Sequence, residues 1–117
     1  MKKIISLFKR DYEGNRKVYD YVVPGAEWVI DGEGVATRKW DGTSCMVRDG
    51  VLYKRYDAKK GKVPPDNWEP AEPARNKHTG HWPGWVPVGD GPEDKWHRDG
   101  FKNSGNLPDG TYELCGP

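Results

Sequence analysis

The chain has 117 residues, a length that suits one domain of ordinary size with one modest core. Its 19 basic residues nearly balance 18 acidic ones, so net charge gives no nucleic-acid signal, and a basic surface would need local clustering. The mean hydropathy of −0.98 is strongly polar, and no run approaches the ~18 apolar residues of a membrane helix. Only two cysteines are present, which predicts reduced thiols in a cytoplasmic protein.

The first third of the chain is predicted to be β structure. Apolar residues alternate in segments 4–8, 18–23 and 28–30, and Pro24-Gly25 and residues 31–34 interrupt them. The first of these segments is too short to be the apolar part of a signal peptide plus its cleavage site. It is predicted to be the first strand.

The next segment predicts a β-hairpin. Residues 44–48 and 51–56 alternate in the manner of strands, and they flank Asp49-Gly50. Asp-Gly suits the two-residue type I′ turn, which requires left-handed backbone at both central positions.

Residues 57–106 form a long segment rich in proline and tryptophan, without clear periodicity. Pure linkers lack tryptophan, so aromatic side chains are expected to order this segment, which resembles a lid or binding loop. Residues 95–103 are the best candidate for a helix, and residues 109–115 predict a turn and a strand. The expected organisation is a single domain over residues 1–117, with residues 57–106 as a long insertion.

The tetrapeptide 39–42, just before the predicted hairpin, has the pattern K-x-D-G. A lysine amine becomes a nucleophile only after it loses its proton, which desolvation or cationic neighbours favour. Arg38 precedes Lys39, and Lys54 and Arg55 are expected to approach it from the second strand of the hairpin. Asp41 and Gly42 are predicted to form the tight turn that directs Lys39 into a pocket, since glycine accepts backbone angles that other residues avoid.

Alone, this tetrapeptide is a weak signal, because short motifs often occur as ordinary exposed turns. Three signals occur in order, however: the K-x-D-G segment, the basic pair Lys54-Arg55, and an acidic strand at residues 112–114. They resemble motifs I, Ia and III of the covalent nucleotidyltransferases, which include ATP-dependent DNA and RNA ligases and mRNA capping enzymes. Residues 35–44 resemble the RNA-ligase version of motif I, in which an apolar strand leads into the lysine.

Residues 80–88, with the string Gly-Trp-Val-Pro-Val, and Lys95-Trp96-His97 are similar to a stretch of the vertebrate-type RNA ligase family, which has bacterial and phage members. The resemblance runs from about Val35 to Pro117. It implies an ATP-dependent 5′-to-3′ RNA ligase for RNA repair, which joins a 5′-phosphate to a 3′-hydroxyl through a lysyl-AMP intermediate. It also implies ATP and Mg²⁺ as cofactors, with RNA carrying those two ends as the partner.

The resemblance assigns a role to each matching position. Lys39 would be the catalytic nucleophile that becomes adenylylated. The residues implied to bind the nucleotide are Thr37 and Arg38 at the pocket wall, Ser44 and Glu113 at the ribose, and Arg55 at the ribose or phosphates. Glu113 could instead sit beside the metal.

The same family carries a metal-binding motif IV and a lysine-bearing motif V after motif III, and neither follows within residues 1–117. The sequence therefore predicts an incomplete ligase domain, with weak or absent adenylylation unless a complementary C-terminal half is added. The expected fold class is α+β, mostly antiparallel β, as the N-terminal part of an ATP-grasp-like nucleotidyltransferase domain.

Two alternatives stay open. Six tryptophans and six tyrosines beside 19 basic residues could form a non-catalytic module for single-stranded RNA, with bases stacked on aromatic rings. Against it, Trp82 and Trp85 neighbour prolines rather than arginines, as expected of residues that order a loop and fill a core. The other alternative keeps the superfamily and changes the substrate, to DNA ends or a cap guanylate.

Overall fold

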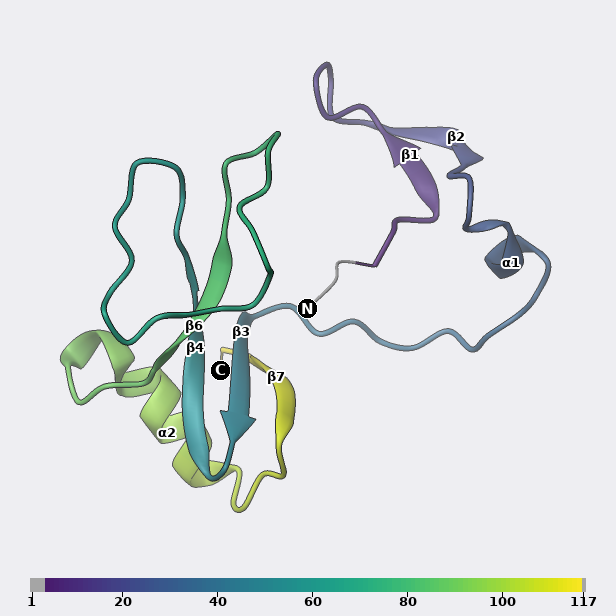
Figure 1. Cartoon of the computed structure of the whole chain (residues 1–117). Coiled ribbons are helices and arrows are strands. Elements are labelled where there is room, and N and C mark those ends of the chain that lie inside the picture. The colour runs from purple at the N-terminus through teal and green to yellow at the C-terminus, as the bar shows by residue number, and fades with distance from the viewer. Residues whose placement is uncertain (1–3, 117) are drawn as a thin grey trace. The chain divides into compact units, whose positions relative to one another are not determined.

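The computed structural model describes residues 4–116, which form an α+β protein with mostly antiparallel sheets (Figure 1). The described residues divide into two compact units, residues 4–38 and residues 39–116. The first unit holds β1 (Phe8–Arg10), β2 (Val18–Val22) and the short helix α1 (Glu27–Ile30). The second holds β3 (Thr43–Arg48), β4 (Val51–Asp57), β5 (Glu69–Pro70), β6 (Pro83–Pro87), the 3₁₀ turn η1 (Pro92–Asp94), α2 (Lys95–Asn103) and β7 (Gly110–Leu114).

The unit of residues 4–38 is a two-stranded antiparallel ribbon followed by one helical turn. Asp11 closes the ribbon, because its carboxylate accepts hydrogen bonds from the backbone N–H groups of Gly14 (2.8 Å) and Asn15 (3.2 Å). Ala26 is buried, but most large apolar side chains of this unit are exposed. A ribbon of two strands has little core, so this unit is the less stabilised part of the chain.

Two predictions for this unit are wrong. The first strand begins at Phe8, and residues 4–7 are not in a strand. Residues 28–30 lie in α1, where the Asp31 N–H donates to the Glu27 carbonyl (3.1 Å) and the Glu27 carboxylate accepts from the Gly25 N–H (2.8 Å). An apolar run of three residues fits one helical turn as well as a strand, and these local hydrogen bonds favour the helix.

The unit of residues 39–116 is built on a five-stranded antiparallel sheet with the order β5-β6-β4-β3-β7. The central hairpin is confirmed: Cys45 pairs with Lys54 and Arg48 pairs with Val51. Asp49 and Gly50 both have positive φ angles, 53° and 77°, as the type I′ turn requires. The predicted C-terminal strand is also confirmed as β7, which lies along the other side of β3.

Residues 57–106 contribute more regular structure than the sequence indicated. β6 pairs with β4 on one side and with β5 on the other, and the predicted helix at residues 95–103 is confirmed as α2. β6 was missed because it is short and has a proline at each end. These prolines lack an N–H group, but they do not end the pairing of β6 with β4. Hydrogen bonds continue just outside the strand, where the Ala58 N–H donates to the Trp82 carbonyl (2.8 Å) and the Val88 N–H donates to the Leu52 carbonyl (3.0 Å).

Tryptophan side chains order the loops of this segment, as predicted. The Trp68 indole N–H donates to the Tyr56 carbonyl (3.1 Å), and the Trp82 indole N–H donates to the Glu72 carbonyl (2.9 Å). The two indoles meet edge to face with their centroids 5.0 Å apart. A Cβ atom on Gly84 would lie 2.1 Å from the Trp68 indole nitrogen, so β6 needs glycine where this ring packs.

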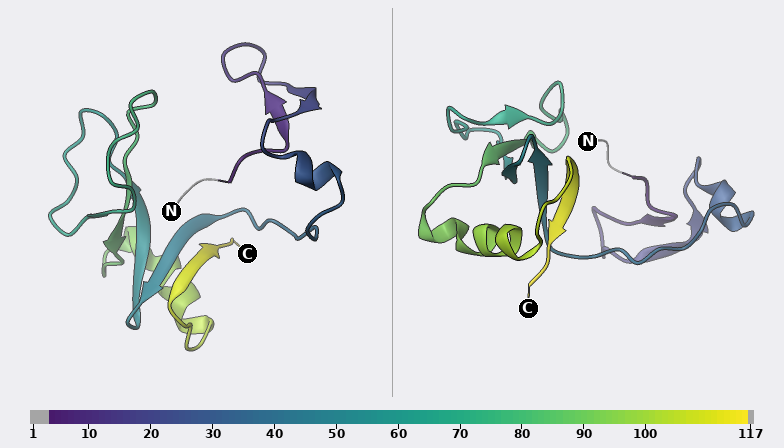
Figure 2. Two further views of the ribbon diagram at one scale, coloured as in Figure 1. Left: turned by 45° about the vertical axis from the view of Figure 1, so that its right-hand side comes forward. Right: turned by 90° about the horizontal axis from the view of Figure 1, so that it is seen from below.

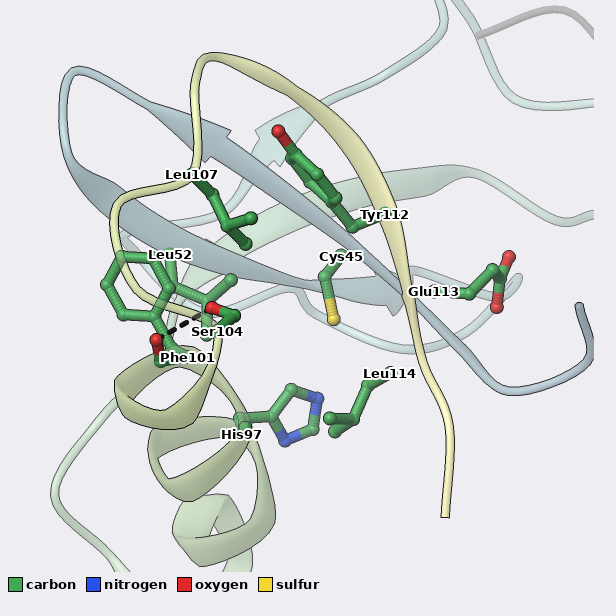
Figure 3. Close-up of a pocket in the computed structure, with 10 residues that line it drawn as sticks. Cys45, Leu52, His97, Phe101, Ser104, Leu107, Tyr112, Glu113 and Leu114 are labelled. Atoms are coloured by element: carbon green, nitrogen blue, oxygen red, sulfur yellow. Dashed lines mark hydrogen bonds between the residues drawn. The ribbon is translucent and has the colours of Figure 1, made fainter. Parts of the chain in front are cut away.

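Helix α2 lies beside the sheet in Figure 1 and in both views of Figure 2. His97 and Phe101, one turn apart on the helix, both face the sheet: His97 points toward Cys45 and Leu114, and Phe101 toward Leu52 (Figure 3). A Cβ atom on Gly100 would lie 2.7 Å from Leu114 Cδ1, so glycine allows the helix to approach β7 closely. Part of the core of this unit therefore lies on the α2 side of the sheet, whereas buried Trp85, the register partner of Arg55, lies on the other face.

A buried ion pair fixes the start of α2 to the sheet. Lys54 Nζ donates to Asp94 Oδ1 at 2.5 Å, and the other carboxylate oxygen accepts from the Gly89 N–H at 2.7 Å. The Asp94 side chain is only 4% exposed. Burial alone would raise the pKa of Asp94, but the hydrogen bonds from Lys54 and Gly89 lower it overall.

Both cysteines are free thiols, Cys45 buried and Cys115 exposed. Within residues 4–116, no helix combines the length and the apolar composition needed to cross a membrane.

Candidate functional site

Strand alternation divides the sheet of residues 39–116 into two chemically different faces. Cys45 faces α2, and its strand neighbour Ser44 therefore faces away from the helix. Ser44 is the register partner of Glu113 on β7, whose carboxylate points away from the Cys45 and His97 side chains in Figure 3. Polar side chains thus collect on the face that α2 leaves uncovered.

An open pocket of about 490 Å³ lies on this uncovered face, within the unit of residues 39–116. It brings together four predicted site residues from three separate segments of the chain. Its lining consists of Lys39, Trp40, Asp41, Gly42, Thr43, Ser44, Arg55, Asp57 and Glu113. Lys39 and Glu113 are 74 positions apart in the sequence, and the pairing of β3 with β7 is what gathers them at one pocket.

Gly42 is required here, but for a different reason from the one predicted. Its φ angle is not among the positive ones, so no left-handed turn is involved. A Cβ atom on Gly42 would lie 2.2 Å from the Leu114 carbonyl oxygen, so the glycine lets the K-x-D-G segment pass against β7. The segment therefore depends on the sheet edge beside it.

The predicted cationic environment of Lys39 is only partly present. Arg55 lines the same pocket as Lys39. Lys54 does not line it, because Lys54 points to the opposite face and is paired with Asp94. Neighbouring residues of a strand point to opposite faces of the sheet, so only one of Lys54 and Arg55 can line the pocket, and that residue is Arg55.

Thr37 and Arg38 belong to the unit of residues 4–38, whereas Lys39 begins the other unit. Both are exposed and neither lines the pocket. Their predicted role in nucleotide binding stays a prediction.

Asp57 is a pocket residue that the sequence reasoning missed. It is the last residue of β4, two positions after Arg55, so the two side chains emerge on the same face. One carboxylate oxygen is paired with Nδ1 of His81, and the other accepts a hydrogen bond from the Trp82 backbone N–H at 3.0 Å. Arg55 was identified from the basic pair and the motif resemblance; strand alternation from Arg55 could have pointed to Asp57, but nothing local to His81 indicated its partner.

Ionised Asp57 is favoured by these contacts. Burial alone would raise its pKa, but hydrogen bonds from His81 and Trp82, and the positive charge of Arg55, lower the pKa overall. Three carboxylates, those of Asp41, Asp57 and Glu113, therefore line the pocket beside the two cations Lys39 and Arg55.

Carboxylate oxygens of the kind carried by Asp41, Asp57 and Glu113 are ligands that magnesium prefers. No group of three or more His, Cys, Asp and Glu side chains among residues 4–116 is arranged to hold a metal ion. Mg²⁺ is commonly held by one or two carboxylates together with substrate phosphates and water, so the contact of Glu113 with Mg²⁺ stays a prediction. We derive no chemical step from a metal.

The chain matches no protein-family model and no curated protein. The interpretation of the pocket therefore rests on its own residues and on the motif resemblance.

Proposed function

We propose that the pocket of residues 39–113 is the adenylylation site of an ATP-dependent RNA ligase that acts in cytoplasmic RNA repair, with Lys39 as the nucleophile. The observation that supports this proposal most strongly is the meeting of Lys39, Ser44, Arg55 and Glu113 at one pocket. These are four of the six positions for which the motif resemblance implies a nucleotide-binding role; Thr37 and Arg38 do not line the pocket. A chance K-x-D-G turn would not be expected to gather the other three.

In the proposed reaction, uncharged Lys39 Nζ attacks the α-phosphorus of ATP. A nitrogen–phosphorus bond forms, the bond from the α-phosphorus to the bridging oxygen breaks, and pyrophosphate leaves. The second proton of the amine is released to solvent. The adenylyl group is then available for transfer to an RNA 5′-phosphate, which a 3′-hydroxyl attacks with release of AMP.

The other lining residues have roles that follow from their chemistry. The Arg55 guanidinium can bind phosphate oxygens through two parallel hydrogen bonds, which orients the phosphate chain. The Ser44 hydroxyl and the Glu113 carboxylate lie on paired positions of β3 and β7, where together they can hold the ribose hydroxyls. Orientation of this kind contributes to phosphoryl transfer by aligning the attacking and leaving groups.

The test is covalent labelling with α-labelled ATP and Mg²⁺, followed by denaturing electrophoresis. Wild-type protein is expected to take up label when a complementary C-terminal half is added, and weakly or not at all without it. Lys39→Ala and Lys39→Arg are expected to take up none under either condition. Lys39→Arg keeps the positive charge and removes the nucleophile, so it separates chemistry from electrostatics. Lys62→Ala, an exposed lysine away from the pocket lining, is the matched control and should label like wild type.

Label that persists in Lys39→Arg would show that Lys39 is not the nucleophile. Labelling by GTP in preference to ATP would instead favour a capping-type enzyme, and transfer to DNA ends in preference to RNA would favour a DNA ligase.

One observation favours a second candidate, a module for single-stranded RNA. Two tryptophans are more than half exposed and each follows a lysine: Trp40 (54%) lines the pocket, and Trp96 (66%) lies 4.3 Å from Lys95 Nζ. Exposed rings beside cations can stack bases next to phosphate contacts. RNA binding that depends strongly on salt, needs neither ATP nor Mg²⁺, and is lost in Trp40→Ala and Trp96→Ala without any lysine labelling would favour the module.

A further inference from the structure

Asp57 is held at the pocket by two contacts from outside it. Its carboxylate is paired with His81 and also accepts from the Trp82 N–H at 3.0 Å. The neighbouring residue Ala58 donates to the Trp82 carbonyl at 2.8 Å, so the backbone at the end of β4 is fixed to the same segment. The carboxylate therefore has one defined position beside Arg55.

The partner of this carboxylate, His81, is more accessible to solvent than the carboxylate itself. The His81 side chain is 45% exposed, whereas the Asp57 side chain is 23% exposed. Imidazole is the side chain that ordinarily changes charge between pH 5 and 8. A proton taken up by His81 from solvent therefore adds one positive charge next to a carboxylate that lines the pocket.

Other charged groups surround the pair. Arg55 on β4 acts on Asp57, and the remaining charged groups of the pocket are Lys39, Asp41 and Glu113. On the side of His81, the neighbouring Gly80 carbonyl accepts hydrogen bonds from Arg75 (3.0 Å) and from the Lys60 backbone N–H (2.9 Å). The Arg75 guanidinium donates to the backbone carbonyls of Ala58 and Gly80, and these hydrogen bonds fix its orientation.

The charged side chains that line the pocket affect how an anionic ligand binds, and the charge of His81 adds to theirs. The lining carries one more carboxylate than it has cations. A polyphosphate meets net repulsion there when His81 is neutral. When His81 is protonated, it offsets the charge of Asp57 and the balance becomes even.

We propose that His81 is a positioning residue of the Lys39 pocket: it holds Asp57 at the pocket wall and, by taking up a proton, strengthens the binding of a polyphosphate anion. This inference rests on the proposed function, because it takes the pocket to be the site of the ATP phosphates. By linkage, a polyphosphate that binds more tightly to the protonated form must raise the pH at which His81 takes up its proton.

The first measurement is the affinity of inorganic tripolyphosphate across about pH 5.5 to 8 for wild type, His81→Gln, Asp57→Asn and His78→Gln. Tripolyphosphate itself takes up protons in this range, so the quantity compared is the ratio of wild-type to variant affinity at each pH. His81→Gln keeps a hydrogen-bond donor for Asp57 and cannot titrate. His78 is an exposed histidine outside the pocket lining, and its variant is the matched control.

The ratio of wild-type to His81→Gln affinity is expected to rise about fivefold as pH falls, the effect of one unit charge near a solvated site. Asp57→Asn should bind tripolyphosphate more tightly than wild type at the higher pH, and His78→Gln should follow wild type throughout. A flat ratio for His81→Gln would overturn the proposal.

The second measurement is an NMR titration of His81 in folded wild type, with and without tripolyphosphate, which does not depend on any variant. A rise in the midpoint supports the inference, and an unchanged midpoint overturns it. The Lys39 label is scored separately. A raised midpoint with no label even after a complementary C-terminal half is added would refute the adenylylation site and keep the charge coupling. Label with an unchanged midpoint would do the reverse.

Discussion

The two faces of the sheet in residues 39–116 differ in what they contribute. Toward α2, the strands present the buried side chains Cys45 and Val47, and the ion pair of Lys54 with Asp94 joins the helix to β4. On the other face, the same strands present Ser44, Arg55, Asp57 and Glu113 at an open pocket. The alternating residues of β3 and β4 thus contribute to the core on one side and to a charged site on the other.

This difference shows how a small protein can separate stability from chemistry. Charges on the α2 face are paired and buried, so their removal is expected to weaken folding. Charges on the pocket face are accessible to ligands, so their removal is expected to change binding with little effect on folding. Each face therefore predicts a different outcome for a similar substitution.

The largest expected effect is on the α2 face. Asp94→Asn removes the charge that pairs with Lys54 and leaves that ammonium partly buried without its counter-ion. We expect a loss of about 3 kcal/mol in the free energy of unfolding, measured by urea denaturation. Because the folded-state pKa of Asp94 is lowered, its stabilisation is present above the pKa of an unfolded aspartate and is lost as pH falls through the lower folded value. The variant should lack this acid-dependent loss; equal urea midpoints for the two proteins would contradict the role of the pair.

A smaller effect is expected on the pocket face, in binding. If the pocket holds ATP, Arg55→Ala should weaken ATP binding about tenfold, or about 1.4 kcal/mol, through the loss of a charge-assisted contact. Its urea midpoint should stay close to that of wild type. Arg48→Ala is the matched control, because Arg48 lies on the same face, pairs with Glu69 at 2.7 Å and does not line the pocket. Equal losses of ATP affinity in both variants would point to a general charge effect.

The smallest effect returns to the α2 face. Both ring nitrogens of His97 are buried without a hydrogen-bond partner, and burial lowers the pKa of this side chain, with Asp94 opposing the shift. His97→Phe should stabilise the fold by about 1 kcal/mol, because it removes an unsatisfied polar ring from an apolar environment. In wild type, the lowered pKa of His97 means that this side chain takes up a proton more readily in the unfolded state below about pH 6.5. The free energy of unfolding should therefore decrease as the pH is lowered through this range. Thermal unfolding of both proteins at several pH values measures this; a wild-type slope that His97→Phe retains would assign it to another group.

Local patterns predicted the hairpin, α2 and β7, because each depends on a turn signal or an alternation within a few residues. They failed where hydrogen bonds that the patterns do not encode, or groups distant in the sequence, decide the conformation. Residues 28–30 form a helical turn through hydrogen bonds that the apolar pattern does not encode, and β6 was hidden by its two prolines. Gly42 was identified as important, but its reason lies in the Leu114 carbonyl, which no local pattern places beside it.

The sequence by itself determined the residue types of the candidate site, since K-x-D-G, Arg55 and Glu113 were recognised from their order along the chain. Tertiary structure alone decided which of them share a pocket. The pairing of β3 with β7 places Glu113 beside Ser44. Strand alternation directs Lys54 to the face opposite Lys39. The segment before β6 places His81 in contact with Asp57. Contacts across 24 to 74 positions arise only when the sheet closes, because loop closure and core packing select them together.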